Sequence, residues 1–232
     1  MATVNAYPAG GTFLDTLKKS FTDVPVDKEK HNAISTTEFL EAAESLTTLF
    51  DVLGSVAFTP VKSDMLGNIK KIRDRQLAAP LESATLQDLV INELKTKKHT
   101  ATEGLVWLVR YNPSSPLPPP QLPHNPNLTL NFQPSALDFT SIALSQNIAV
   151  STEELSTSFR NAYGNTLKPF HGFLIKPVFS AAMSACPYRA DFYAKLGVDQ
   201  DQVLAGLRVW LSALETILAV LKGFLDRKEA KW

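Results

Sequence analysis

The chain has 232 residues, of which 44% are hydrophobic, so it is long enough to bury one well-filled core. Its 23 basic and 23 acidic residues balance without a long run of either sign, which argues against a nucleic-acid-binding protein. The single cysteine, Cys186, excludes a disulfide within the chain and fits a reducing compartment. We expect one domain over residues 1–232, with a core from about residue 12 to residue 227.

Targeting and membrane-spanning signals are not evident. The N-terminal stretch MATVNAYPAGG has neither a basic n-region nor an apolar h-region, so no secretory signal is expected. The longest apolar runs, GLVWLV and ILAV, are much shorter than the roughly 18 residues of a spanning helix. We expect a soluble, cytoplasmic protein, and contact with a membrane surface remains open.

The first half of the chain has a helical pattern. A short helix is expected from near Thr12 to the stretch SFTDV. In STTEFLEAAESLTTLFDVLG, Ser35 and Glu38 have the spacing of a capping box, and Gly54 is a stop signal. Between them the apolar residues recur every three to four positions, as in an amphipathic helix: Phe39, Leu40, Ala43, Leu46, Phe50 and Leu53.

The helical pattern continues to the C-terminus. Pro60 suits the first turn of the next helix, and TLQDLVINELKTKK and ATEGLVWLVR follow as further helices. STEELSTSFRNAYGNTL repeats the capping-box signal with Ser151 and Glu154. HGFLIKPVFSAAMSA and DQVLAGLRVWLSALETILAVLKGFLDR complete the set. Because no strand alternation or hairpin dipeptide interrupts this pattern, we predict an all-α fold.

Residues 111–136, YNPSSPLPPPQLPHNPNLTLNFQPSA, break the pattern with eight of the 15 prolines. Prolines at this density forbid a helix and favour extended conformations. If one residue replaces the segment, Leu105 and Leu108 join Leu137 and Leu144 in one apolar stripe. We therefore predict a disordered Pro-rich insert within a single helix, with an ordinary linker between two helices as the alternative. The composition also fits an unspliced intron translated in frame.

A polar column lies on the helix that contains KSDMLGNIKKIRDR. Asp64, Asn68 and Lys71 fall at i, i+4 and i+7, within an arc of about 60°, beside an apolar stripe that includes Met65 and Ile69. A carboxylate accepts hydrogen bonds, an ammonium donates them and an amide does both, so the column suits a ligand with many hydroxyls, such as a sugar. By itself, the spacing is more often that of a solvated polar face.

Two other side chains are candidates for the same ligand. The flat indole of Trp107 can stack on the apolar face of a sugar ring, or it can pack in the core. His171 lies among aromatic residues, where a neutral histidine can donate to a carbonyl oxygen or be an ordinary core residue.

Signatures of catalysis are weak. The sequence has no GxSxG elbow, Walker loop or GxGxxG, and its histidines lack the spacing of metal ligands. Cys186 has no adjacent base that would activate it. A hydrolase with Asp64 and His171 as acid–base partners would lack an evident nucleophile. We expect no enzymatic activity, no metal and no cofactor.

Taken together, FDVLGSVAFTPVKSDMLGNIKKI, WLVR, FHGFLIKPVFSAAMSACPYRADF and the helical pattern resemble the glycolipid transfer protein family. The likeness is greatest to fungal members of the heterokaryon incompatibility protein C type, and it spans the core except for the insert. It implies a two-layer sandwich of eight helices that binds one glycosphingolipid. Such proteins hold the sugar at a surface site and the ceramide in an apolar tunnel, and they move the lipid between membranes without covalent chemistry.

The resemblance assigns roles to the polar residues. Asp64 matches the aspartate that contacts both the sugar and the ceramide amide N–H, and Asn68 and Lys71 match its sugar-binding partners. Trp107 matches the stacking tryptophan, and His171 matches the histidine that donates to the ceramide carbonyl.

The resemblance also implies apolar contacts. Phe173 stands where related members have a tryptophan that touches the membrane. Positions matching the tunnel region are Leu49, Phe50, Leu53, Phe58, Leu167, Phe179 and Ala182. The implied partners are a glucosyl- or galactosylceramide-like lipid and, transiently, a membrane surface, with no nucleic acid and a monomeric state.

Departures from the family bear on the head group. Asn68 and Trp107 stand where the branch that carries ceramide-1-phosphate has a lysine and an arginine, so a neutral sugar is favoured over a phosphate. Glu103 replaces an apolar residue of animal members. Transport and sensing both stay open as the role. The alternative function is a lipid-responsive adaptor recruited through the PxxP sequence of the insert.

Overall fold

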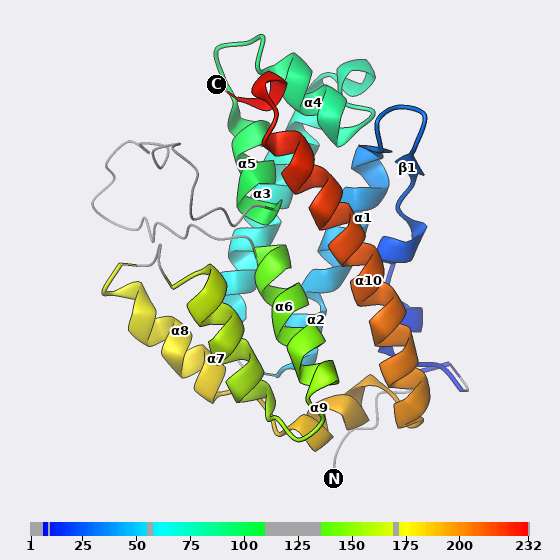
Figure 1. Cartoon of the computed structure of the whole chain (residues 1–232), viewed down its shortest axis with the longest axis vertical. Coiled ribbons are helices and arrows are strands. Elements are labelled where there is room, and N and C mark those ends of the chain that lie inside the picture. The colour runs from blue at the N-terminus through cyan, green and yellow to red at the C-terminus, as the bar shows by residue number, and fades with distance from the viewer. Residues whose placement is uncertain (1–6, 9, 55–57, 110–135, 169–171, 232) are drawn as a thin grey trace.

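The computed structural model describes residues 7–8, 10–54, 58–109, 136–168 and 172–231, and these residues are mostly helical (Figure 1). The longer helices are α1 (Thr36–Thr47), α3 (Thr59–Ala78), α4 (Leu86–Glu93), α5 (Thr100–Val109), α6 (Ala136–Ala149), α7 (Leu155–Thr166), α8 (Ile175–Ser184), α9 (Arg189–Leu196) and α10 (Gln200–Leu225). Shorter helical segments are η1 (Phe13–Thr16), η2 (Phe21–Asp23), α2 (Leu49–Val52), η4 (Pro80–Glu82) and η5 (Lys228–Ala230).

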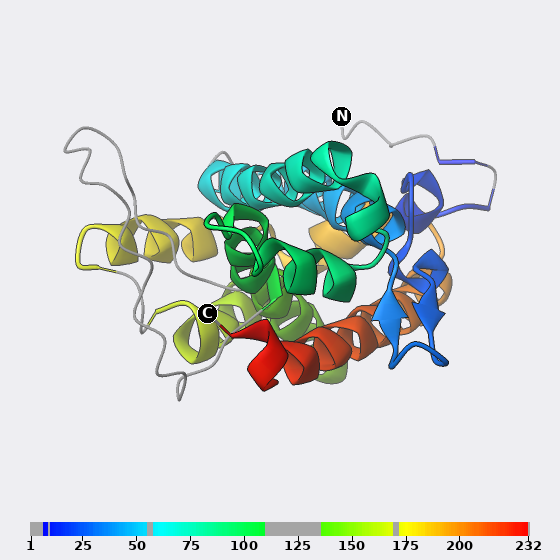
Figure 2. The same cartoon turned by 90° about the horizontal axis from the view of Figure 1, so that it is seen from above.

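The helices form two layers. Seen from above, α1 and α3 lie on one side and α6, α7 and α10 on the other (Figure 2). Helix α5 packs against α3, α4, α6 and α10, so it joins the layers. Helix α4 covers one end of the sandwich and α9 the other (Figure 1). The predicted all-α, two-layer fold is therefore confirmed.

A small antiparallel strand pair is the feature that the sequence pattern did not predict. Strand β1 (Val26–Asp27) pairs with β2 (Ala33–Ile34), with Val26 opposite Ile34. His31 and Asn32, with φ of 55° and 59°, make the turn. Two residues per strand are too few for an alternating pattern, so this pair leaves no periodic signal in the sequence.

The amphipathic segment after Ser35 is two helices rather than one. Helix α1 ends at Thr47 and α2 begins at Leu49. The hydroxyls of Thr47 and Thr48 donate at 2.7 Å to the carbonyls of Glu44 and Ser45. Such back-bonding competes with the helical hydrogen-bond pattern and bends or interrupts it. The predicted stop at Gly54 fits its φ of +70°.

The two predicted capping boxes differ in outcome. At α1 the helix begins after Ser35, as predicted, although the Ser35 hydroxyl donates to the Glu38 carboxylate instead of accepting from the backbone. The start predicted from Ser151 is wrong, because α7 begins at Leu155 with Glu154 as its N-cap. The Glu154 carboxylate accepts from the Arg189 N–H at 2.7 Å, so it serves α9.

The leading segment is also shorter than predicted. Instead of one helix from Thr12, it forms the separate 3₁₀ turns η1 and η2. In each turn an acid accepts the cap residue's N–H: Asp15 from Thr12 at 2.6 Å, and Asp23 from Ser20 at 3.3 Å. Each turn is therefore closed by its own local hydrogen bonds.

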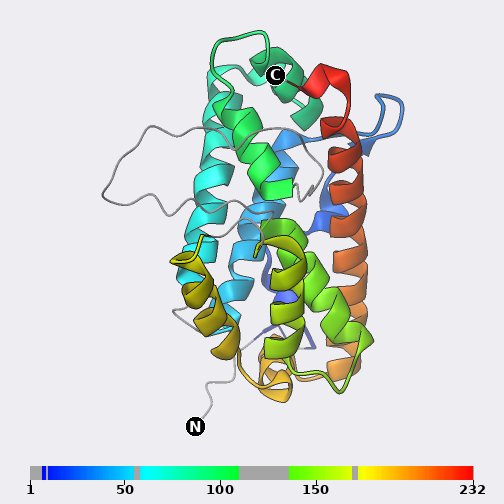
Figure 3. The same ribbon diagram turned by 60° about the vertical axis from the view of Figure 1, so that its left-hand side comes forward.

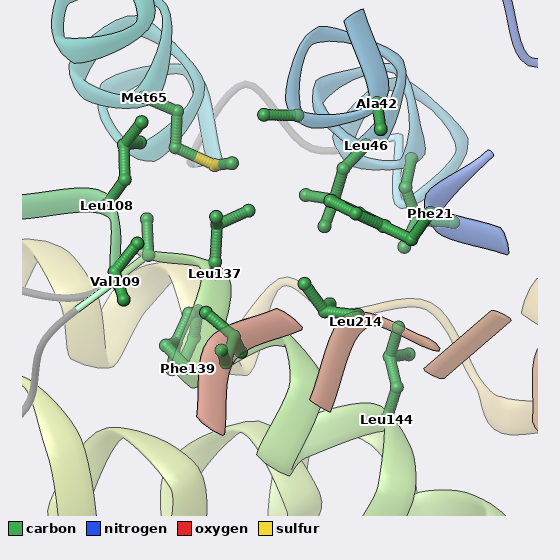
Figure 4. Close-up of a cluster of buried hydrophobic side chains, with 14 of the residues drawn as sticks. Phe21, Ala42, Leu46, Met65, Leu108, Val109, Leu137, Phe139, Leu144 and Leu214 are labelled. Carbon is green, nitrogen blue, oxygen red and sulfur yellow. The ribbon is translucent and has the colours of Figure 1, made fainter. Parts of the chain in front are cut away.

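The predicted insert falls outside the described residues except for Ala136, which begins α6. On either side of it, α5 ends beside the start of α6 (Figures 1 and 3). Leu108 of α5 and Leu137 of α6 are both fully buried and belong to one cluster with Met65 of α3 (Figure 4). The apolar stripe predicted across the insert is thus one continuous buried face, carried by two helices.

Side chains from both layers meet in a single core. Figure 4 shows Phe21 of η2 and Leu46 of α1 facing Leu214 of α10 and Leu144 of α6. Among the described residues, α10 is long and apolar enough to span a membrane by composition alone. Here α10 packs against α6 and η2 with its apolar face and turns Arg208 to solvent, as a core helix does.

Candidate functional site

The polar column predicted on α3 is a chain of hydrogen bonds. Asn68 Nδ2 donates to the backbone carbonyl of Asp64 at 3.1 Å and to its carboxylate at 3.3 Å. Lys71 Nζ donates to Asn68 Oδ1 at 2.9 Å. Because the lysine occupies the amide oxygen, the amide nitrogen is turned toward Asp64. The three side chains are thus held in one orientation before any ligand arrives.

The column lies at the edge of the core and not on a solvated face. The Asn68 side chain is only 3% exposed, and Asp64 and Lys71 are half-buried. Burial raises the pKa of Asp64 to about 6, against the opposing effects of the Lys71 ammonium and the Asn68 hydrogen bond. A buried carboxylate with an amide and an ammonium beside it can both accept from and donate to a polar ligand.

Helix α5 crosses α3 closely at Gly104, a residue that the sequence analysis did not single out. A Cβ at Gly104 would lie 3.0 Å from the Asn68 carbonyl oxygen and 3.2 Å from Lys71 Cβ. Trp107 lies three residues farther along α5, half-buried, and Glu103 lies one helical turn before it. Gly104 therefore brings the helix of the tryptophan against the polar column. An isolated glycine within a helical pattern is the signal that could have identified it.

The start of α5 is held by Glu93, which the sequence analysis also missed. Its buried carboxylate accepts from the N–H groups of Ala101 and Thr102 at 3.0 and 2.6 Å, and from the Thr102 hydroxyl at 2.7 Å. A carboxylate at the free N–H groups of a helix start is stabilising. Glu93 belongs to α4 and reaches α5 across a loop, so no local sequence pattern marks this contact.

The apolar positions assigned to a tunnel are all buried: Leu49, Phe50, Leu53, Phe58, Leu167, Phe179 and Ala182. Aromatic contacts connect several of them. Phe50 stacks on Phe58 at 5.8 Å between ring centroids, and Phe58 meets Phe159 edge to face at 5.7 Å. Phe179 stacks on Tyr163 at 5.1 Å. Phe159 and Tyr163 thus join the cluster, although the sequence analysis did not name them.

Of the other candidate residues, His171 lies outside the described residues. Phe173 is 81% exposed just before α8, next to the exposed Leu174. Burial raises the pKa of Cys186 to about 12, so its thiol is protonated at neutral pH. Within the described part of the chain, no group of three or more His, Cys, Asp or Glu side chains could hold a metal ion.

Helices in two layers, with a polar column at the edge of an apolar cluster, define a protein that binds an amphipathic molecule. The family model for glycolipid transfer proteins matches residues 34–111 and 134–198, so the chain belongs to the glycolipid transfer protein family. The matched stretches leave out residues 112–133, which lie inside the predicted insert.

Individual proteins that are similar to this chain support the same family assignment. The chain is 64% identical over 227 residues to a glycolipid transfer protein of Aureobasidium melanogenum, with 98% of this chain and 99% of that protein covered. It is 30% identical to pleckstrin homology domain-containing family A member 8 of Danio rerio, covering 90% of this chain and 36% of that longer protein.

Solved structures that are similar to this chain include a member of the same family. The crystal structure of HET-C2, a fungal glycolipid transfer protein, matches with a TM-score of 0.82 and 62% identity, over 95% of this chain and 100% of that one. Mouse ceramide-1-phosphate transfer protein matches with a TM-score of 0.72 over 93% of this chain and 95% of that one, but only 18% identity, and so shares the fold. The predicted resemblance to fungal members of the heterokaryon incompatibility type is confirmed.

Proposed function

We propose that this protein binds a glycosphingolipid and carries it between membranes without covalent chemistry. The observation that carries the proposal is the hydrogen-bonded column of Asp64, Asn68 and Lys71 beside α5 and the buried apolar cluster. The 64% identity to a fungal glycolipid transfer protein supports it. The polar column can form directional hydrogen bonds with a head group, and the apolar cluster can shield hydrocarbon chains from water.

The head group binds at the column. Sugar hydroxyls donate to the Asp64 carboxylate and accept from Lys71, while the Asn68 amide can do both. One face of the sugar ring stacks on Trp107. The Asp64 carboxylate also accepts from the ceramide amide N–H, and His171 donates to the ceramide carbonyl, as the family resemblance implies. This set of contacts recognises a sugar and the amide of the lipid at the same time.

The ceramide tails bind among the tunnel residues named above. Each buried methylene is worth about 0.8 kcal/mol, so two long tails need apolar cover to pass through water. A bilayer provides similar cover, and transfer therefore exchanges two environments of comparable free energy. No chemical energy source is required in principle. Phe173, exposed just before α8, contacts the membrane while the lipid is exchanged.

The preferred cargo has a neutral sugar, as in glucosyl- or galactosylceramide. Lys71 is the one cation of the column, and its ammonium is already bonded to Asn68, while Glu103 adds a negative charge nearby on α5. A phosphate would face the carboxylates of Asp64 and Glu103 with a single ammonium to balance them. The protein acts as a monomer in the cytoplasm and touches membranes transiently.

The test is transfer of labelled glucosylceramide from donor to acceptor vesicles. Intact lipid should appear in the acceptor vesicles at a rate proportional to protein concentration. Asp64→Ala should abolish most of this transfer, while Asp74→Ala should not, because Asp74 is an exposed residue of the same helix that pairs with Lys70. Chemical change of the lipid would show an enzyme, and no movement of lipid would refute the carrier function.

A further inference from the structure

Two leucine side chains are strongly exposed to solvent at the end of the molecule that α4 covers. Leu77, in the last turn of α3, is 74% exposed, and Leu81 of η4 is 96% exposed. Soluble proteins expose single apolar side chains often, but a fully exposed leucine at a protruding turn loses the whole benefit of burial. Neither side chain contributes to the core described above.

Two segments that adjoin α4 at the same end carry exposed lysines. The loop after α4, KTKKH, holds Lys97 and Lys98, and the C-terminal segment around η5 holds Lys228 and Lys231. All four are exposed, and none pairs with an acid among the described residues. The helix dipole of α4 favours a cation at its own C-terminus, but it accounts neither for the lysines of η5 nor for the exposed leucines.

Hydrogen bonds and helix contacts bring these segments together at one end of the molecule. Lys95 Nζ donates to Asn92 Oδ1 at 2.8 Å, and Asn92 Nδ2 donates to the carbonyl of Glu82 at 3.1 Å, which ties the lysine loop to the turn of Leu81. Helix α4 also contacts η5, and Figures 1 and 3 both show the C-terminus beside α4. We call Leu77, Leu81, Lys97, Lys98, Lys228 and Lys231 the α4-end surface.

Three acids near this surface are either paired with an arginine or buried. Glu82 pairs with Arg75 at 2.5 Å, and Glu229 pairs with Arg227 at 3.5 Å. Glu93 is buried and bonded to the N–H groups at the start of α5. The α4-end surface itself therefore exposes four ammonium groups and no carboxylate, although the whole chain has a net charge of zero.

Exposed leucines flanked by long basic side chains suit the surface of an anionic bilayer. Apolar side chains gain free energy by entering the interface, while lysine ammonium groups remain at the level of the lipid phosphates. A nucleic acid would attract the lysines but offer nothing to the leucines. We propose that the α4-end surface docks this protein on anionic bilayers, with Leu77 and Leu81 in the interface and the lysines on lipid phosphates.

This contact is separate from the one proposed for Phe173. Helix α8 lies beside the lower half of α3 in Figure 3, whereas α4 and the C-terminus lie at its upper end. The proposal also does not depend on glycolipid transfer, because it concerns the charge of the membrane and not the cargo. Binding to the α4-end surface should respond to anionic lipid and to salt, as attraction between charges does.

The experiment measures co-sedimentation with vesicles of phosphatidylcholine, with and without phosphatidylserine, at low and high salt. Wild-type protein should prefer the vesicles with phosphatidylserine, and salt should weaken this preference. Each lysine near such a surface is worth about a fivefold change in affinity. Lys97→Glu and Lys98→Glu should therefore each weaken binding by about fivefold or more. Arg208→Glu, the same charge change at an exposed site on α10, should have little effect.

The leucines are tested in the same assay. Leu81→Ser should weaken binding to the anionic vesicles, whereas Val198→Ser, at an 89% exposed valine after α9, should not. Circular dichroism and binding of a short-chain glucosylceramide in solution should be unchanged in all variants, which separates this surface from the cargo site. The proposal is overturned if wild-type protein shows no preference for phosphatidylserine, or if the lysine and leucine variants bind like their controls.

Discussion

The Lys71 ammonium donates to Asn68 Oδ1, and this single bond fixes which way the Asn68 amide points. With its oxygen occupied, Asn68 turns Nδ2 toward the Asp64 carboxylate. The column is therefore ordered by its own hydrogen bonds, and each member depends on the others for its orientation. Removing the central amide should disturb both ends.

The first prediction concerns this central residue. Asn68→Ala should slow glycolipid transfer more than tenfold, because it removes a ligand contact and leaves the half-buried Asp64 carboxylate without its amide donor. Helical content by circular dichroism should be retained. Gln76→Ala, which affects an exposed bond to Thr37 farther along α3, is the matched control. Full transfer by Asn68→Ala would exclude the column as the head-group site.

The second prediction is a pH dependence of cargo binding. Asp64 has a pKa raised from 3.8 to about 6, so its ionised form is disfavoured in the folded protein without cargo. Acidification below about pH 6 protonates it, and the carboxyl then loses acceptor capacity for the amide N–H and the sugar hydroxyls. Glycolipid binding followed by tryptophan fluorescence should weaken from pH 7 toward pH 5.

The same titration has the opposite effect on folding. Because the folded pKa lies above the unfolded value, protonation of Asp64 stabilises the protein without cargo as the pH falls through about 6. This contribution is fully present below about 3.8 and is lost as the pH rises through about 6. Asp64→Asn should remove both dependences. A wild-type binding profile that stays flat from pH 7 to 5 would contradict the assignment.

The third prediction concerns the close approach of α5 and α3. Gly104→Ala places a Cβ 3.0 Å from the Asn68 carbonyl oxygen, so α5 must move away from the column. Alanine favours a helix over glycine by up to about 1 kcal/mol, yet we expect a lower melting temperature and slower transfer. Gly67→Ala is the control, because a Cβ there meets nothing within 4 Å. If Gly104→Ala and Gly67→Ala raise the melting temperature equally, α5 and α3 do not pack closely at Gly104.

The fourth prediction concerns head-group selectivity. Ceramide-1-phosphate should compete poorly with glucosylceramide for wild-type protein, because a phosphate adds negative charge near Asp64 and Glu103. Glu103→Leu removes one of these charges and should improve competition by sulfated or phosphorylated lipids. Glu153→Leu would be a poor control, because the Glu153 carboxylate in the α6–α7 loop accepts a hydrogen bond from the Gln146 amide. Glu29→Leu, in the exposed β1–β2 turn, is suitable. Equal competition by all lipids for the wild type would refute the proposed selectivity.

The fifth prediction concerns the start of α8. Phe173→Ala should slow transfer between vesicles more than it weakens binding of a soluble short-chain glycolipid, because the side chain is 81% exposed. Tyr188→Ala changes another strongly exposed aromatic residue, before α9, and should leave the rate unchanged. An unaltered rate with Phe173→Ala, together with normal vesicle association, would remove Phe173 from the docking face.

The sequence alone determined those features whose cause is local. Asp64, Asn68 and Lys71 lie on one face because a helix repeats every 3.6 residues, so their spacing already predicted the column. The start of α3 near Pro60 and the stop at Gly54 follow from backbone preferences of single residues. Family membership was equally accessible, because it rests on short motifs in a fixed order.

The tertiary structure alone decided what depends on distant partners. Glu93 holds the start of α5 from another helix, and Gly104 matters because α3 lies against it. Ser151 does not begin α7, since the acids that follow it bond to Gln146 and Arg189 instead. Leu108 and Leu137 share one buried face although the insert separates them in the chain. A pattern along the sequence records the preference of each segment, but close contacts are set by how the segments pack together.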